Sequence, residues 1–178
     1  FEKNLLFYKN FPKAQKNAIK IARYLQKKET FLPNGDSLTV KRFQQLGLQL
    51  GFSDGPSKLN YLFEDAFVKD ELSYTFLKNI FSEQSFDTNP LFTILHEACY
   101  AQKFSTHWSA QRIRKEFQQF NDGHDNFYFT GEMLFPWMMD EYKNLKPFKN
   151  IALGLAEKND WSILYDKKIL NNNIVPVA

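Results

Sequence analysis

Apolar side chains recur at intervals of three and four residues along most of this chain, and this spacing constrains its fold more than any other feature. The clearest case lies between residues 12 and 28, where apolar and basic side chains occupy opposite faces of one helix. The apolar face carries Ala14, Ala18, Ile21, Ala22 and Leu25. The basic face carries Lys13, Lys16, Lys20, Arg23 and Lys27. Pro12 stands where the first helical turn accepts proline.

The same spacing predicts further helices, separated by glycine, proline and polar caps. They cover approximately residues 39–50, 53–67, 73–84, 89–102, 106–117, 136–142 and 147–158. Gly51 is a natural helix stop, and Ser53, Asn89 and Thr106 are the expected N-caps of the segments that follow them. Because Pro136 cannot sit deep in a helix without a kink, the segment 130–142 is kinked or begins its regular helix there. The pattern predicts an all-α fold.

Two short segments interrupt this pattern. Residues 121–125 have the composition of a turn, and the aromatic run Phe127–Phe129 that follows is predicted to be extended. On the helix over 89–102, the predicted buried stripe is Leu91, Ile94, Leu95 and Ala98. The opposite face carries Thr93, Glu97 and Tyr100. Cys99 lies close to the buried stripe, so we expect it to be packed.

Composition supports a single helical domain. The length of 178 residues suits one domain with a substantial core. Phe, Tyr and Trp make up 17% of the chain, whereas glycine occurs only 7 times. So little glycine argues against glycine-rich phosphate loops and tight-turned β-sandwiches.

Charge is concentrated at one end of the chain. Residues 1–28 hold eight basic side chains against Glu2 alone, although the net charge of the whole chain is only +3. Such a stripe can bind nucleic acid or a membrane surface. Aromatic side chains do not interleave with these lysines as a base-stacking platform requires. The sequence therefore favours a solvated helix face, with no nucleic-acid and no membrane partner.

The longest apolar run predicts no membrane span. It extends from Met133 to Met139, far short of the ~20 residues that a transmembrane helix needs. The amino terminus lacks the apolar core and cleavage site of a signal peptide. The single cysteine, Cys99, cannot form an internal disulfide, which fits a reducing compartment, and we expect a cytoplasmic location.

Two short patterns look catalytic but fail on physical grounds. Residues 51–55 spell GxSxG, yet a nucleophile elbow needs a preceding strand, and residues 40–50 are predicted to be helical. Residues 96–100 begin like the zinc-binding HExxH, but position 100 is Tyr, and His96 and Cys99 supply two ligands where zinc needs three or four. We therefore expect no metal and no cofactor.

Two carboxylates among aromatic side chains are the remaining candidates. Glu97 has Tyr100 three residues later, and a half-apolar wall around a charge suits a cation. The alternative is an exposed Glu beside a Tyr. Glu132 lies among Phe129, Phe135 and other large side chains, but a Glu near a helix start also serves simply to oppose the helix dipole.

The segments around these carboxylates resemble the cap region of the longer bacterial proline iminopeptidases. The resemblance rests on residues 95–102 (LHEACYAQ), 129–133 (FTGEM) and 135–138 (FPWM), and it extends in the same order from residue 38 to the closing residues 175–178. That family consists of serine hydrolases of the α/β-hydrolase fold. The resemblance implies that residues 1–173 form a multi-helix cap and that residues 174–178 begin a strand of the absent hydrolase sheet.

The resemblance also implies a function. In the family the serine nucleophile precedes the cap, and the catalytic Asp and His follow it, so this chain holds no catalytic residue and is expected to be inactive alone. Its partners would be the missing hydrolase domain and a peptide with N-terminal proline. Glu97 and Glu132 would bind the free amino end of that peptide. Tyr100, Phe135 and Trp137 are candidate walls around the pyrrolidine ring, although core packing explains each aromatic equally well.

A different class of function stays open. A free-standing helical domain has the same composition, with its aromatics forming a groove for a partner protein and its basic helix meeting an acidic surface. The two alternatives differ in whether the polypeptide continues into a hydrolase.

Overall fold

Helices dominate the architecture, as the sequence predicts. The computed structural model describes residues 1–121, 126–163 and 166–172, apart from the side chains of Tyr100 and Ile169. Within these residues the one sheet is an antiparallel hairpin of β1 (Phe67–Val68) and β2 (Glu71–Leu72). The predicted all-α class is confirmed. The strand predicted over residues 174–178 and most of the turn over 121–125 lie outside the described residues.

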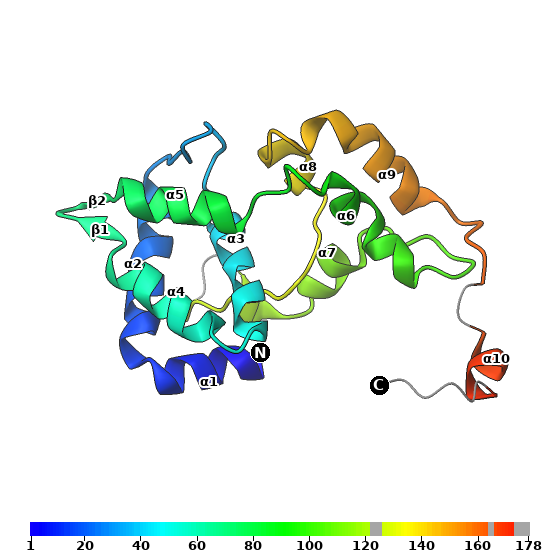
Figure 1. The fold of residues 1–178 in the computed structure, drawn as a ribbon, viewed down its shortest axis with the longest axis horizontal. Coiled ribbons are helices and arrows are strands. Elements are labelled where there is room, and N and C mark those ends of the chain that lie inside the picture. Colours follow the sequence, from blue (N-terminus) through cyan, green and yellow to red (C-terminus); the bar gives the residue numbers. More distant parts are fainter. Residues whose placement is uncertain (122–125, 164–165, 173–178) are drawn as a thin grey trace.

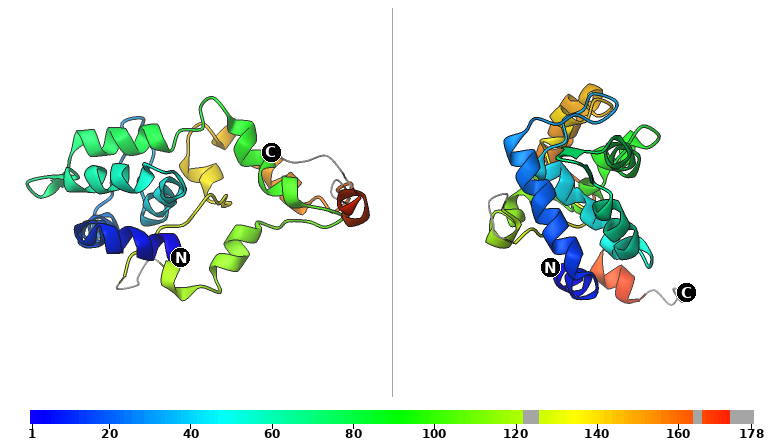
Figure 2. Two further views of the ribbon diagram at one scale, coloured as in Figure 1. Left: turned by 60° about the horizontal axis from the view of Figure 1, so that its bottom comes forward. Right: turned by 90° about the vertical axis from the view of Figure 1, so that its left-hand side faces the viewer.

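The helices gather in two groups (Figure 1). The first group comprises α1 (Glu2–Asn10), α2 (Pro12–Lys27), α3 (Val40–Gln44), the 3₁₀ segment η1 (Gln45–Gly51), α4 (Gly55–Glu64) and α5 (Tyr74–Glu83). The second comprises α6 (Pro90–Leu95), η2 (Glu97–Tyr100), α7 (Ser109–Arg114), α8 (Met138–Glu141), η4 (Lys146–Phe148) and α9 (Lys149–Glu157). The segment η3 (Gln118–Phe120) packs Phe120 against the core of the first group. The short helix α10 (Lys167–Asn171) lies apart from both groups, as the two further views also show (Figure 2).

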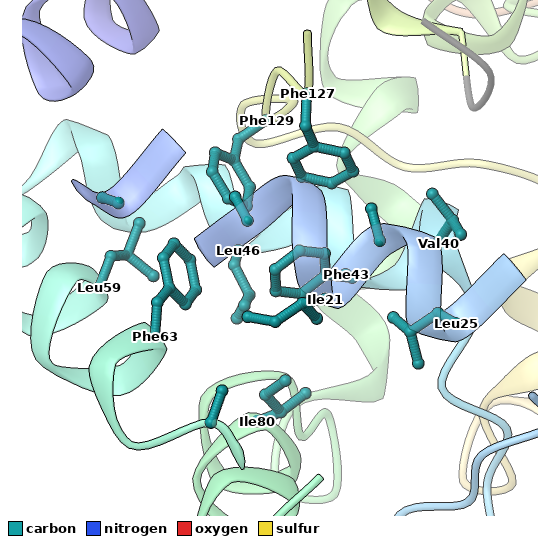
Figure 3. Packing of buried hydrophobic residues seen from close by; sticks show 14 of the residues in the cluster. Ile21, Leu25, Val40, Phe43, Leu46, Leu59, Phe63, Ile80, Phe127 and Phe129 are labelled. Atoms are coloured by element: carbon teal, nitrogen blue, oxygen red, sulfur yellow. The ribbon is translucent and has the colours of Figure 1, made fainter. Parts of the chain in front are cut away.

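The first group encloses the larger hydrophobic core (Figure 3). Helix α2 buries the five apolar residues that its spacing predicts, and its lysines stay exposed. Phe43 of α3 is fully buried, with its ring 5.6 Å from that of Phe63 and 5.1 Å from that of Phe127. The aromatic run 127–129, predicted to be extended, is non-helical and buried in this core.

Side chains of α1 satisfy the backbone of the aromatic run. The amide of Asn4 donates to the carbonyl of Phe129 at 2.9 Å, and the backbone N–H of Phe129 donates to Asn4 Oδ1 at 2.7 Å. The hydroxyl of Tyr8 donates to the carbonyl of Phe127 at 2.5 Å, and burial raises the pKa of Tyr8. Buried backbone groups need partners, and here side chains replace a neighbouring strand. The sequence pattern does not reveal α1, since its apolar residues form no clear stripe.

The second group has its own smaller core. Its fully or largely buried members are Leu134, Phe135, Met138, Met139, Tyr142, Leu145 and Ala152. The helix predicted from Pro136 begins two residues later, as α8. The helix predicted over 147–158 is confirmed as η4 followed by α9.

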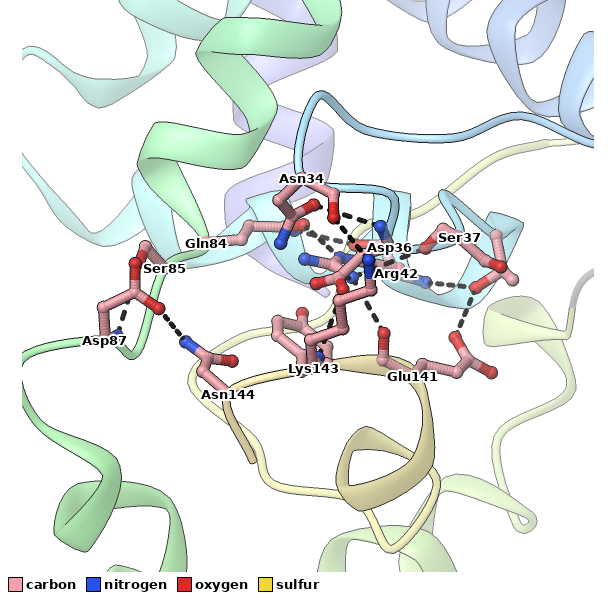
Figure 4. Close-up of polar contacts among 12 residues, drawn as sticks. Asn34, Asp36, Ser37, Arg42, Gln84, Ser85, Asp87, Glu141, Lys143 and Asn144 are labelled. Carbon is pink, nitrogen blue, oxygen red and sulfur yellow. Dashed lines mark hydrogen bonds and ion pairs between the residues drawn. The ribbon is translucent and has the colours of Figure 1, made fainter. Parts of the chain in front are cut away.

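A buried ion pair links the two groups (Figure 4). Arg42 Nη1 lies 3.1 Å from Asp36 Oδ2, and the two side chains are only 1% and 2% exposed. The same nitrogen donates to the carbonyl of Glu141 at the end of α8, and Gln84 at the end of α5 donates to the carbonyl of Arg42. The guanidinium carbon lies 3.7 Å from the ring centroid of Tyr142. One cation thus contacts elements from both helical groups.

The helix predicted over 39–50 changes type at its middle. Thr39 caps α3 by accepting from the backbone N–H of Arg42, but from Gln45 onward the chain tightens into η1. A Cβ atom at Gly47 would lie 1.9 Å from the carbonyl oxygen of Thr130. Glycine is therefore required where the aromatic run crosses this segment.

The helix predicted over 89–102 is also shorter than expected. It breaks after Leu95, so Leu91, Leu95 and Cys99 are exposed, and the predictions that they are buried are wrong. Thr93, predicted to be on the open face, is buried, and its hydroxyl donates to the carbonyl of Pro90 at 2.6 Å. Only Ile94 and Ala98 of the predicted stripe are buried. The break at His96 prevents one continuous stripe from facing the core.

Of the three expected helix caps, Asn89 alone takes the cap position of its helix. Ser73, which the sequence analysis does not assign as a cap, caps α5 by accepting from the N–H of Phe76 at 3.1 Å. Asp54, rather than Ser53, precedes α4, and Trp108, rather than Thr106, precedes α7. Asn89 precedes α6 without a side-chain cap bond. Within the described ranges, no helix has the length and hydropathy to cross a bilayer.

Removing the buried cation should destabilise the whole chain. Arg42→Met leaves the Asp36 carboxylate buried without its counter-charge, so we expect the free energy of unfolding to fall by about 3–5 kcal/mol. Urea unfolding followed by circular dichroism measures the loss. The exposed pair Lys58–Asp54 supplies the control, since Lys58→Met should leave the midpoint unchanged. A loss from Arg42→Met below about 1 kcal/mol, as for a surface pair, would contradict this role.

The contact between Asn4 and the aromatic run gives a second test. Asn4→Ala leaves the buried N–H and C=O of Phe129 without partners, so we expect a loss of about 2 kcal/mol or more. Hydrogen exchange should also become faster at the amide of Phe129. The exposed Asn10, at the end of the same helix, is the control. Equal effects of Asn4→Ala and Asn10→Ala would refute the proposed contact.

Candidate functional site

Glu97 lies at the start of η2, where it holds the first turn of α7. Its Oε1 atom accepts a hydrogen bond from Ser109 Oγ at 2.6 Å and another from the backbone N–H of Ala110 at 3.3 Å. A carboxylate at a helix N-terminus satisfies free backbone N–H groups and opposes the helix dipole. Glu97 therefore does what the sequence assigns to Thr106.

The second oxygen of this carboxylate has a different environment. Glu97 Oε2 is buried, and the described residues provide it with no hydrogen-bond partner. A buried polar atom without a partner is costly, and such atoms are uncommon in folded proteins. The side chain as a whole is only partly exposed, so the alternative of a fully exposed Glu beside a Tyr is wrong. One oxygen of Glu97 is thus fixed by α7, and the other is available to a donor or a cation.

Glu132 lies in the loop that leads from the aromatic run to α8. It is exposed, and it lines a cavity of about 60 Å³ together with Gln45, Gln49 and Phe92. Helix α8 begins only at Met138. The helix-dipole alternative for Glu132 is therefore wrong, because the effect is confined to the first turn.

Hydrogen bonds from η1 fix the wall of this cavity. Gln45 Nε2 donates to the carbonyl of Met133 at 3.0 Å, and the hydroxyl of Tyr142 donates to Gln45 Oε1 at 2.8 Å. Burial raises the pKa of Tyr142, which keeps this hydroxyl protonated as a donor. The backbone beside Glu132 is thereby tied to both helical groups.

A second carboxylate lines the same cavity. Glu83, at the end of α5, faces it and accepts a hydrogen bond from Gln49 Nε2. The sequence analysis does not single out Glu83, because nothing in its local pattern distinguishes it from a solvated helix-end residue. Only the packing of α5 against η1 brings it near Glu132.

Residues close to Glu97 in the chain or bonded to it line the cavity of Glu132 and a second cavity. Phe92 of α6 lines the cavity of Glu132, and the chain runs from α6 directly into Glu97. On the other side, Ala110, whose N–H binds Glu97, lines a second cavity together with Met133, the residue after Glu132. Glu132 therefore lines the first cavity, and Ala110, the partner of Glu97, lines the second.

The predicted aromatic walls have different surroundings. Phe135 is 1% exposed inside the smaller core, and its ring stacks on that of Trp137 at 5.7 Å. Trp137 is partly exposed, Lys41 Nζ lies 4.7 Å from its ring centroid, and its indole nitrogen is buried without a hydrogen-bond partner among the described residues. The residues that line the cavity of Glu132 include neither ring. The side chain of Tyr100 lies outside the described residues.

The structure also shows the surroundings of the two short patterns that look catalytic, GxSxG at residues 51–55 and the HExxH-like start at residue 96. The segment before Ser53 is the 3₁₀ segment η1, so the strand that a nucleophile elbow requires does not precede it. His96 packs its ring 4.8 Å from that of Phe92. In the part of the chain that the structure describes, no group of three or more His, Cys, Asp or Glu residues is arranged to hold a metal ion.

Comparison with curated proteins points first to a class, the enzymes named proline iminopeptidases. The chain is 47% identical to the proline iminopeptidase of Aeromonas sobria over 179 residues, which cover 99% of this chain and 42% of that protein. It is 31% identical to the proline iminopeptidase aneH of Aspergillus aculeatus, over 98% of this chain and 40% of that protein. No family model matches the chain. The resemblance predicted from its motifs is confirmed, and the chain spans about two fifths of the length of these relatives.

Two substitutions at Glu97 distinguish the effect of its hydrogen bonds to α7 from the effect of its negative charge. Glu97→Ala removes the acceptor for Ser109 and Ala110, and we expect it to lower the free energy of unfolding by about 1 kcal/mol. Glu97→Gln keeps a side-chain oxygen acceptor and should be close to the unchanged chain. Urea unfolding of both variants measures the difference. If Glu97→Ala is as stable as Glu97→Gln, the carboxylate does not hold α7.

Proposed function

We propose that this chain is the helical cap of a serine aminopeptidase that releases proline from the amino terminus of peptides. The observation that carries the proposal is the 47% identity to a proline iminopeptidase over 99% of the chain. The helical fold supports it, and so do Glu132 at one cavity and Ala110, the hydrogen-bond partner of Glu97, at another.

In this proposal, Glu97 and Glu132 bind the free amino end of the substrate. An N-terminal prolyl imino group is a cation, and a carboxylate about 4 Å away at an effective dielectric near 20 contributes on the order of 4 kcal/mol before desolvation. The buried Oε2 of Glu97, which has no hydrogen-bond partner in the part of the chain that the structure describes, suits an N–H donor of this kind. Peptides with blocked amino ends lack the charge, so the two carboxylates would restrict the enzyme to free termini.

The proposal also gives a role to three aromatic residues, Tyr100, Phe135 and Trp137. Tyr100 follows Glu97 in η2, and the stacked pair Phe135 and Trp137 lies beyond the loop of Glu132. We assign them to the apolar walls around the pyrrolidine ring. Phe135 would act by supporting Trp137, since it is itself buried in the smaller core.

The chemistry would come from the part of the parent polypeptide that this chain does not include. There, a serine would attack the prolyl carbonyl, a histidine would take its proton, and water would release proline from the acyl enzyme. The cap would orient the amine and exclude bulk water. No cofactor or metal is needed for this reaction.

The alternative of a free-standing interaction domain has less support. Its basic helix would need to present an unpaired charged face to an acidic partner. On that face, Lys20 lies 4.0 Å from the ring centroid of Phe67, and just after the helix Lys28 forms an ion pair with Glu71 at 2.5 Å. The alignment over nearly the whole chain also favours a segment of a longer enzyme.

The amine-binding role predicts a selective loss of activity. In the parent enzyme, we expect Glu97→Gln or Glu132→Gln to lower kcat/KM for a prolyl amide by at least about tenfold, which corresponds to 1.4 kcal/mol. Cleavage of an N-acylated ester should change little, since that substrate carries no amine charge. Both rates are measured on the same preparation of each variant.

Glu64→Gln, on the exposed end of α4, is the matched control and should leave both rates unchanged. If both substrates lose activity equally, or neither does, Glu97 and Glu132 do not bind the amine. If the parent polypeptide cleaves no prolyl substrate at all, the proposed enzyme class is wrong.

A further inference from the structure

An apolar groove lies between α7 and the amino-terminal end of α1. Its volume is about 290 Å³, and it is lined mainly by Phe1, Ala110, Ile113, Phe117, Phe120 and Met133. In Figure 2 the start of α1 lies close to the segment that follows α7. The groove therefore brings together three parts of the chain that are far apart in sequence.

Several apolar side chains that line this groove are exposed to solvent. Ile113, Phe117 and Met133 are 51%, 44% and 40% exposed, and Phe1 is 53% exposed. Leu5, one helical turn after Phe1, is also exposed on α1. Adjoining exposed apolar side chains of this size mark an interaction surface rather than ordinary protein exterior.

Two of the polar side chains that line the groove, those of Arg114 and Thr130, already form hydrogen bonds within the chain. Arg114 donates to Gln44 Oε1 at 2.6 Å and to the carbonyl of Phe120 at 2.8 Å. Thr130 donates through its hydroxyl to the carbonyl of Gln44. With these groups committed within the chain, the groove offers a partner mostly apolar contacts.

The position of the groove indicates what covers it. Its lining includes a neighbour of each proposed amine-binding residue: Ala110, whose backbone N–H donates to Glu97, and Met133, which follows Glu132 in sequence. The Aeromonas sobria relative has more than half of its length outside the aligned segment. A body that docks on the groove would contact Ala110 and Met133, the neighbours of the two carboxylates.

We infer that this groove is the face on which the catalytic part of the same polypeptide docks. The inference rests on the proposed function, which it extends by assigning the contact surface to α7, the start of α1 and Met133. The groove residues would then be buried in the parent enzyme, whereas exposed residues of the same types elsewhere on the chain stay in solvent.

Hydroxyl-radical footprinting of the parent-length protein tests this assignment without any substitution. The test residues Phe117 and Ile113 are compared with Phe31 and Ile151, which have similar exposure, 50% and 57%, on other elements. Burial in an interface core should lower the modification of Phe117 and Ile113 by roughly fivefold relative to these controls. Mass spectrometry of the modified peptides gives the rates.

The outcomes separate this inference from the proposed function. Protection of Phe117 and Ile113 that persists on dilution supports docking within one polypeptide. Equal modification of test and control residues overturns it, and protection that disappears on dilution overturns it in favour of a second copy of the chain. Hydrolysis of a prolyl amide is measured on the same sample. Activity with an unprotected groove supports the proposed function and refutes the docking face. Protection without activity supports the docking face and refutes the proposed function.

Discussion

The buried cation of Arg42 is the interaction on which the arrangement of the two helical groups depends. Its partners come from the turn at Asp36, the end of α5 and the end of α8, and its guanidinium stacks on Tyr142. A buried ion pair contributes little to stability compared with apolar packing, but it tolerates few alternative geometries. Each element that contacts Arg42 must therefore end at a fixed place, which in turn fixes the walls of the cavity that Glu132 lines.

Glu97 shows how one side chain can serve both structure and recognition. One oxygen is used to begin α7, and this contact holds the second oxygen in a buried position where none of the described residues is its hydrogen-bond partner. A flexible surface carboxylate would have to be ordered on binding, which costs conformational entropy. The contact with α7 already orders the side chain of Glu97, and Ala110, which makes that contact, also lines the apolar groove.

Local signals were reliable where a segment is long and amphipathic. The buried face of α2 follows from the spacing of its apolar residues alone. The same reasoning was wrong for the segment after Asn89, where the helix breaks at His96 and Thr93 is buried instead of Leu91. Short helices have few residues with which to define a face, so neighbouring elements decide which side is covered.

The sequence by itself determined that the chain is helical, that Glu97 and Glu132 merit attention, and that its motifs resemble those of proline iminopeptidases. These conclusions depend on local spacing and on motif identity, which are properties of the unfolded chain as much as of the folded one. Only the tertiary structure decided that Glu97 caps α7, that Glu83 joins Glu132 at one cavity, and that Asn4 supports the aromatic run. Those contacts join residues far apart in sequence, and their partners are chosen by packing and by the need to satisfy buried polar groups.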